Sequence, residues 1–286
     1  MKTLKVTLLT AILLMCSSCT LMGIGYSYAD WLIKKRILSV VKLYKPQQKH
    51  LEKQLDDYMA WHKVTMLPEY GKELDRVAKR VEALKKDKKK VSKEEVYQLL
   101  INTRQLYLDS FIPLTTRVIP LLAELIEGQV DRSRTLITRK IDEIKEQTKL
   151  TQEQIVSELR GTWEDNLDDW FGKLSAEQLK LLDEHIPLLV TSPMIRFARG
   201  VKRMQLFLAV FENNPIKDNL TQNKANRIKG LTDFFNTWSE LKPYDPWRQQ
   251  TALFMSKFLE LTTVKQQDEF LKKLKKWKDA IDEMQK

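Results

Sequence analysis

Residues 174–186 read LSAEQLKLLDEHI, and this short stretch decides the fold class. Ser175 stands three residues before Gln178, which is the spacing of a capping box. In such a box the hydroxyl and the amide side chain each accept a hydrogen bond from an exposed backbone N–H at the helix start. The apolar residues that follow share one face of a helix: Leu179, Leu182 and Ile186. The stretch therefore predicts an amphipathic helix that begins at Ser175.

The same device occurs twice more along the chain. VSKEE at 91–95 and LTQEQ at 150–154 place Ser92 and Thr151 three residues before Glu95 and Gln154. The chain has only eight glycines and nine prolines in 286 residues, about half the usual share of these helix breakers. No run of alternating Val, Ile or Thr indicates a strand. We therefore expect an all-α protein, an elongated multi-helix bundle.

Apolar periodicity and the positions of proline give approximate helix boundaries. Pro46, Pro68, Pro193 and Pro215 are expected at helix beginnings. Pro113 and Pro120 interrupt one long pattern and are expected to kink or split it. The predicted helices span residues 30–43, 46–65, 68–86, 92–112, 114–148, 151–171, 175–190, 193–212, 218–241, 246–262 and 265–285.

The N-terminus has the pattern of a bacterial signal peptide. Lys2 and Lys5 precede an apolar run over 6–15, and small residues follow. A core helix or an uncleaved membrane anchor are alternative interpretations of this segment. Residues 6–29 carry no charged side chain, the next being Asp30, and they are long enough to span a bilayer. The second half of that stretch is polar and contains glycine, which favours cleavage.

Both cysteines lie in LLMCSSCTLMG at 13–23. LLMCSSC resembles a lipobox, in which small residues precede a cysteine that is acylated and becomes the mature N-terminus. Ser17 and Ser18 precede Cys19, whereas bulky Met15 precedes Cys16, so we expect Cys19 to carry the lipid (palmitate-type chains). Ordinary signal peptidase could instead cut after the SYA at 27–29. Lipidation of Cys19 leaves no cysteine pair for a disulfide or a metal, despite the CxxC spacing.

These features suggest a division of the chain and a location. We expect a lipoprotein signal peptide over 1–18, a tether over 19–29, a helical bundle domain over 30–214 and a C-terminal helical segment over 215–286 packed on the same bundle. By resemblance to Gram-negative lipoproteins, a residue other than Asp after the acylated cysteine implies the inner leaflet of the outer membrane, facing the periplasm. Thr20 occupies that position.

Four short segments resemble an uncharacterised family of Gram-negative bacterial lipoproteins: DWL at 30–32, PQQ at 46–48, WHK at 61–63 and LPEY at 67–70. The resemblance runs from the signal peptide to about residue 212 and is strongest before residue 75. Lys63 and Glu69 replace arginines of that family, which puts an anion-binding role for those positions in doubt. Lys45 replaces its capping threonine. The family has no assigned activity, so the resemblance implies location and fold only.

LTQEQ also resembles the Leu-Thr-x-x-Gln motif of Spy-type periplasmic chaperones, although helix capping explains it equally. No catalytic or metal motif stands out. The histidines are His50, His62 and His185, and the first two lie roughly 120° apart around a helix axis. HExxH, GxSxG and glycine-rich phosphate loops are absent from the sequence. We therefore expect no enzyme activity, no cofactor and no metal site, with His62 packed beside Trp61.

The net charge of +11 indicates anionic partners. Nucleic acid is excluded by the expected location, which leaves anionic lipid or lipopolysaccharide headgroups or an envelope protein. The best candidates follow the tether or share one helical face: Lys34, Lys35, Arg36, Arg196, Arg199 and Arg203. A further lysine cluster lies at 272–278. A solvated helix face is the alternative for each set.

Aromatic residues recur at helical spacing, which is typical of a core rather than of a binding groove. These sets are Trp163 with Trp170, Phe207 with Phe211, and Phe234 with Phe235 and Trp238. YDPW at 244–247 fits a core stripe least well. The sequence favours an outer-membrane lipoprotein that acts as a non-enzymatic helical binding or scaffold protein. A holdase-type chaperone is the first alternative, and a periplasmic hydrolase is the second. A deep pocket with converging His62 or carboxylates would favour the hydrolase.

Overall fold

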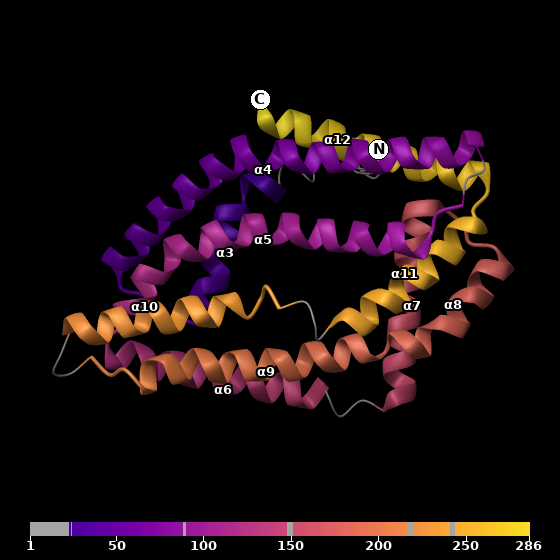
Figure 1. Ribbon diagram of the computed structural model, residues 1–286. Helices are drawn as coiled ribbons and strands as arrows, with labels where there is room; N and C mark the ends of the chain where they lie inside the picture. Colours follow the sequence, from indigo (N-terminus) through magenta and orange to yellow (C-terminus); the bar gives the residue numbers. More distant parts are fainter. Residues whose placement is uncertain (1–22, 24, 88–89, 148–150, 217–219, 241–243) are drawn as a thin grey trace, which may run out of the picture.

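The computed structural model describes residues 23, 25–87, 90–147, 151–216, 220–240 and 244–286 (Figure 1). Every regular element within these ranges is a helix, so the prediction of an all-α multi-helix bundle is confirmed. Cys16, Cys19 and the predicted signal peptide lie outside the described residues.

The first two helices after the N-terminal segment pack against each other: α3 (Ala29–Leu38) and α4 (Lys45–Asp87). The predicted extension of the first helix to residue 43 is wrong. Val41 and Leu43 leave the helix and are buried in the core. Burial of two aliphatic side chains is worth more than one further helical turn. The Gln48 side chain fixes this link by donating to the Leu43 carbonyl at 2.9 Å.

The long helix α4 passes through Pro68, so the predicted break between 65 and 68 is wrong. Proline removes one backbone donor and leaves the Val64 carbonyl without its helical partner. Val64 is 72% exposed, so water can bind that carbonyl. The cost is absorbed as a bend in the middle of α4, visible in Figure 1. The last helix, α12 (Val264–Gln285), packs along α4 and supports it.

Helix α5 (Lys93–Ala123) likewise runs through Pro113 and Pro120. The predicted split at residue 113 is therefore wrong, and the chain leaves the helix ten residues later. Side chains satisfy the carbonyls near the first proline: Thr115 and Thr116 donate to the Ile112 carbonyl at 2.8 and 3.0 Å. Arg117 donates to the Pro113 carbonyl at 2.9 Å. The carbonyl that Pro113 itself leaves without a helical donor is that of Asp109, four residues earlier.

The break after α5 is held by a buried arginine. Arg227, 1% exposed, donates to the Leu125 carbonyl at 2.6 Å and to the Ala123 carbonyl at 3.3 Å. Its Nε also donates to the Asn214 carbonyl at 2.7 Å. Three free carbonyls thus satisfy one buried guanidinium, which would otherwise be costly to bury. The next helix, α6 (Glu127–Gln147), begins after this junction.

The predicted capping boxes at Ser92, Thr151 and Ser175 are all confirmed. A fourth, Thr263 with Gln266 at the start of α12, was not predicted. The remaining helices are α7 (Gln152–Phe171), α8 (Ala176–Leu189), α9 (Thr191–Glu212), α10 (Leu220–Asn236) and α11 (Asp245–Glu260).

Two hydrophobic cores hold these helices together. The first joins the α3–α4 link to the end of α5, α6, α9 and α10, and it includes Phe207, Phe211 and Phe234. The second joins α7, α8 and α11, with Trp163 and Trp170 packed against it. The expectation of core residues is confirmed for Phe207, Phe211 and Phe234, which are buried, whereas Trp163 and Trp170 are only partly buried. Among the C-terminal helices, α10 and α11 pack on α5, and α12 packs on α4 and α7.

By length and composition alone, α5 is apolar enough to cross a membrane. In the structure 44% of its most apolar window is buried. Helices α4, α10 and α11 all pack against it (Figure 1). These contacts explain its apolar character as that of the central helix of a bundle.

Candidate functional site

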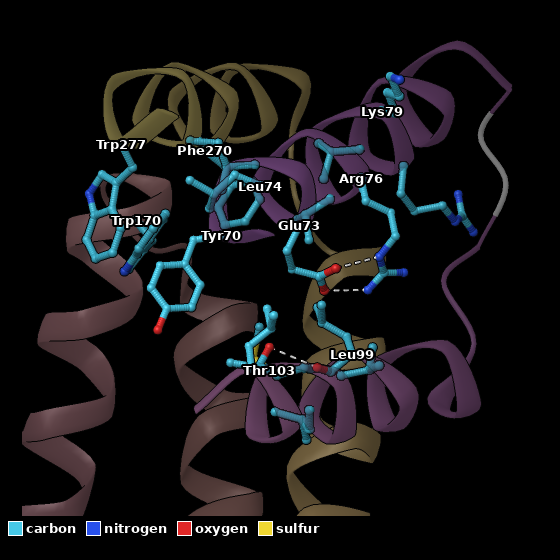
Figure 2. Close-up of a pocket in the computed structure, with 18 of the residues that line it drawn as sticks. Tyr70, Glu73, Leu74, Arg76, Lys79, Leu99, Thr103, Trp170, Phe270 and Trp277 are labelled. Atoms are coloured by element: carbon cyan, nitrogen blue, oxygen red, sulfur yellow. Dashed lines mark hydrogen bonds and ion pairs between the residues drawn. The ribbon is translucent and has the colours of Figure 1, made fainter. Parts of the chain in front are cut away.

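A large apolar groove lies between α4 and α5, and α7, α11 and α12 complete its walls. Its volume is about 1480 Å³, which exceeds the roughly 300–1,000 Å³ of pockets for drug-sized ligands. Figure 2 shows Leu74 of α4 and Leu99 of α5 on opposite walls. Further aliphatic side chains extend both walls: Val77, Val81, Leu106 and Met255.

The groove arises because α4 and α5 each carry an apolar face beyond what the cores require. On α4 this face consists of Leu67, Leu74, Val77, Val81 and Leu84, at spacings of seven, three, four and three residues. Such spacing keeps side chains on one helical stripe. The sequence alone did not indicate a groove here, because an apolar stripe of this kind is also typical of a helix packed in a core.

One end of the groove is aromatic. Trp170 lies 5.2 Å from Trp277 and 5.4 Å from Phe270, measured between ring centroids. Phe171 stacks on Phe270 at 4.7 Å. Trp277 remains 40% exposed, so the aromatic cluster forms part of the opening as well as of the wall (Figure 2).

Polar side chains around His62 also line the groove. His62 Nδ1 lies 3.1 Å from the Tyr26 hydroxyl, and His62 Nε2 lies 3.3 Å from the Tyr70 hydroxyl. The Tyr70 hydroxyl in turn bonds to Ser110 Oγ. Burial lowers the pKa of His62. Burial also raises the pKa of Tyr26 to about 12, so its phenol stays neutral. These hydrogen-bonded side chains are therefore uncharged at neutral pH.

Charged residues border the groove between α4 and α5, and four of them form two ion pairs. Arg76 forms two hydrogen bonds to Glu73, at 2.8 and 2.5 Å. Arg80 forms two to Glu95, at 2.8 and 3.2 Å. Arg80 and the Ser92 cap hold the pKa of Glu95 down at about 2. The border is therefore balanced in charge, and selectivity for an ionic ligand is not built into it.

The arrangement suits binding better than acid–base catalysis. Both ring nitrogens of His62 are engaged by phenols, and within the described residues no carboxylate contacts this imidazole. The deep pocket that would favour a hydrolase is present, and His62, Glu73, Glu94 and Glu95 line it. Within the described residues, none of these carboxylates forms a hydrogen bond to the imidazole. No group of three or more His, Cys, Asp or Glu capable of holding a metal occurs there either.

Comparison with known proteins places the chain in a family. A model of a family of unknown function, DUF6279, matches residues 39–227, which is more than half of the chain. The chain belongs to DUF6279. No curated protein and no solved structure matches it.

The DUF6279 match covers PQQ, WHK and LPEY, three of the four segments on which the family resemblance was based, and begins after DWL at 30–32. It extends to residue 227 rather than 212. Helices α4 to α9 lie within it, whereas α11 and α12, which complete the groove, lie outside it.

The structure also places the basic residues predicted to contact anions. Lys34 forms an ion pair with Glu52 of α4, and Lys35 lies 4.9 Å from the Trp31 ring centroid. Arg36 is exposed in the last turn of α3. Among the described residues of the N-terminal segment, Gly25, Tyr26 and Ala29 line the groove and these three basic residues do not.

Arg199 and Arg203 do meet. Both donate to the Thr237 carbonyl at the end of α10, at 3.1 and 3.0 Å. The side chain of Arg196 and the whole of Cys19 lie outside the described residues. Two of the three predicted arginines of this face are thus brought to one place, separate from the groove.

Proposed function

We propose that this DUF6279 protein is a lipid-anchored, non-enzymatic binding protein of the bacterial envelope that holds an acyl chain in its groove. The observation that carries the proposal is the apolar groove of about 1480 Å³ between α4 and α5. Burial of an acyl chain there is worth about 0.8 kcal/mol for each methylene removed from water. The proposed location is the inner leaflet of the outer membrane, with the protein anchored through Cys19.

An acyl chain suits this lining better than an unfolded polypeptide. An extended peptide carries a donor and an acceptor at each residue, and each buried group needs a partner. The groove walls are almost entirely aliphatic and aromatic, and at the border Arg76 is paired with Glu73 and Arg80 with Glu95. A hydrocarbon chain has no such demand.

The position of the groove supports an envelope role. Gly25 and Tyr26 line its wall, and Gly25 follows Cys19 by six residues. A chain of six residues reaches about 20 Å at most. A lipid on Cys19 would therefore keep the mouth of the groove near the bilayer surface, where acyl chains are available.

A fluorescent fatty acid tests the proposal directly. Thr103→Glu places a carboxylate in the groove, opposite the α4 wall (Figure 2). Thr232→Glu on α10 is the matched control: Thr103 and Thr232 are both exposed and bond to the carbonyl four residues earlier, at 2.9 and 2.8 Å. We expect native protein and the Thr232 variant to bind the probe, and Thr103→Glu to weaken binding at least about tenfold because the charge must be desolvated.

The alternatives give different results in the same experiment. Equal probe binding by all three proteins would contradict the groove as the binding site. A holdase would suppress aggregation of an unfolded envelope protein, with loss of that effect in Thr103→Glu, and would not retain the fatty acid. Native mass spectrometry of protein purified from envelopes would identify the bound lipid.

A further inference from the structure

Four arginines gather where α10 ends and α11 begins: Arg104 of α5, Arg199 and Arg203 of α9, and Arg248 of α11. Burial lowers the pKa of Arg104, and the charges of Arg248 and Arg199 lower it further. Burial, followed by the charges of Arg199 and Arg104, lowers the pKa of Arg203. The four guanidinium groups are therefore close enough to repel one another. We refer to them as the arginine cluster.

Aromatic rings hold three of these guanidinium groups in place. Arg203 lies 4.2 Å from the Trp238 ring centroid, and Arg104 lies 4.9 Å from that of Tyr107. Arg199 lies 5.6 Å from the ring of Tyr244, the first residue of the YDPW segment. Stacking of this kind orients the planar guanidinium and leaves its edge donors available.

Negative charge around the cluster is sparse. Glu240 pairs with Arg199 at 2.7 Å, yet it is half exposed. Within the described residues, no carboxylate forms an ion pair with Arg104 or Arg203. Arg199 Nε is buried and has no hydrogen-bond partner in the described part of the chain. Partial removal of Arg104 and Arg203 from water without a paired carboxylate is costly, so this side of the cluster can be stabilised by an anion.

We propose that the arginine cluster binds a phosphate group. Arginine presents a fork of N–H donors that matches the paired oxygens of phosphate, and such charge-assisted bonds are stronger than neutral ones. Tyr107 is 43% exposed, so the cluster is open to ligands on the α5 side. The phosphate belongs to a lipid headgroup or to a soluble phosphate ester. This site is separate from the groove. The proposal of a phosphate site therefore does not depend on whether the groove binds an acyl chain.

Helix capping is the competing role, because Arg199 and Arg203 both donate to the Thr237 carbonyl. Arg104 distinguishes the two roles, since it stacks on Tyr107 and, among the described residues, only Arg199 and Arg203 donate to the Thr237 carbonyl. Arg104→Gln removes one charge from the cluster and leaves the cap in place. Arg104→Lys restores the charge without the fork. Arg139→Gln, on the exposed face of α6, removes a charge elsewhere.

Full-length protein in maltoside micelles is titrated calorimetrically with glycerol 3-phosphate at constant ionic strength. We expect saturable binding that Arg104→Gln weakens about tenfold or more, which is the effect of losing one charged hydrogen bond. Arg104→Lys should recover part of the affinity, and Arg139→Gln should bind as the native protein does. Thermal unfolding in the absence of phosphate checks that the variants are folded.

Three further probes define the ligand. Inorganic phosphate and soluble dihexanoyl phosphatidic acid, titrated in parallel, distinguish a free phosphate from a lipid headgroup, and tighter binding of either supports the proposal. Acetate at the same ionic strength should bind at least about tenfold more weakly, since it offers one oxygen pair and a single charge. Equal binding of acetate and phosphate would overturn the assignment to phosphate. So would identical phosphate affinity of the native protein and Arg104→Gln.

Discussion

Gln178 and Gln266 exchange hydrogen bonds across the junction of α8 and α12, with each amide nitrogen donating to the other's oxygen, at 3.0 and 2.9 Å. Both are third residues of capping boxes, so the same oxygens also accept the backbone N–H of Ser175 and of Thr263. Both side chains are buried. Two helix starts far apart in the sequence are thus fixed to each other through their caps.

Gln178→Glu should destabilise the protein. A carboxylate keeps the acceptor for the Ser175 N–H but cannot donate to Gln266 or to the Leu261 carbonyl, 3.3 Å away. Leaving buried groups unpaired costs about 1–3 kcal/mol, and more when charge is involved. Urea unfolding measures the change. Gln154→Glu, in the exposed box of Thr151, is the control and should change stability by less than about 0.5 kcal/mol. Equal effects would mean that the pairing with Gln266 adds nothing.

This pair also shows what local sequence can predict and what it cannot. The box at Ser175 follows from a four-residue pattern and was predicted, as were those at Ser92 and Thr151. The pairing of Gln178 with Gln266 depends on how α8 and α12 approach in space, which no local pattern contains. The prediction of a helix break at Pro68 was wrong for the same reason, because proline is tolerated inside this helix where neighbouring helices support the bend, whereas Pro46 does lie at the beginning of α4 as predicted.

The two candidate sites differ in how much of each could be predicted from the sequence. Arg199 and Arg203 share a helical face and were predicted to contact an anion, but Arg104 and Arg248 join them only through packing of α5 and α11. The groove corresponds to one sequence pattern, the apolar stripe of α4. That stripe looks the same whether a partner helix or a ligand covers it.

Gly230→Ala should destabilise the protein although alanine is the better helix former. A Cβ on Gly230 would lie 3.0 Å from Val210 Cγ1 and 3.1 Å from Val210 Cγ2, at the contact of α9 with α10. Overpacking of this kind costs about 1–3 kcal/mol, which exceeds the gain of roughly 1 kcal/mol in helix propensity.

Gly161→Ala provides the opposite case, because nothing lies within 4 Å of its added Cβ in α7. We expect a stabilisation of up to about 1 kcal/mol. The difference between the two variants, measured by urea unfolding, isolates the close approach of α9 and α10. Stabilisation by both substitutions would show that Val210 can move aside.

Stability should fall as pH is lowered through the ordinary pKa of histidine, because burial lowers the pKa of His62 in the folded state. The unfolded chain then takes up a proton below pH 6.5 that the folded protein does not, and the loss ends once pH passes below the folded pKa. Tyr26, Tyr58 and Tyr70 surround the imidazole, and burial raises the pKa of each, so they do not titrate in this range.

Unfolding free energies measured from pH 8 to pH 5 test this expectation. His62→Gln keeps a donor and an acceptor for the two tyrosines but cannot be protonated, so its pH profile should be flatter than that of the native protein. His50→Gln, at an exposed position of α4, is the control. Parallel profiles for the native protein and His62→Gln would show that His62 is protonated equally easily in both states.

Cys19→Ser should abolish acylation and leave unprocessed precursor. Ser17 and Ser18 precede Cys19, which is the context that identifies it as the acylated residue. Metabolic labelling with a palmitate analogue, followed by electrophoresis, measures both effects. Cys16→Ser should be labelled and processed normally, because we expect Cys16 to be removed with the predicted signal peptide. Equal loss of label in the two variants would contradict this assignment.

Without its lipid, the protein of residues 20–286 should bind anionic vesicles weakly, mainly through Lys34, Lys35 and Arg36. Each basic residue near such a surface contributes about 1 kcal/mol. The lysines of α12 should contribute less, because acids neutralise several of them: Lys275 pairs with Asp279 and Lys278 with Asp282, both at 2.7 Å. Lys34 is itself paired with Glu52, so Lys35 and Arg36 are expected to dominate.

Vesicle sedimentation separates these contributions. Changing Lys34, Lys35 and Arg36 together to Gln should reduce binding more than changing the five lysines at 272–278, although it removes fewer charges. Binding should disappear by about 0.5 M salt, because the Debye length shrinks from about 8 Å at physiological salt towards 3 Å at 1 M. Three surface charges orient the first helix against the leaflet, but they are too weak to replace acyl chains as an anchor. If the lysines at 272–278 dominate, or if salt has no effect, the basic turn of α3 is an ordinary solvated surface.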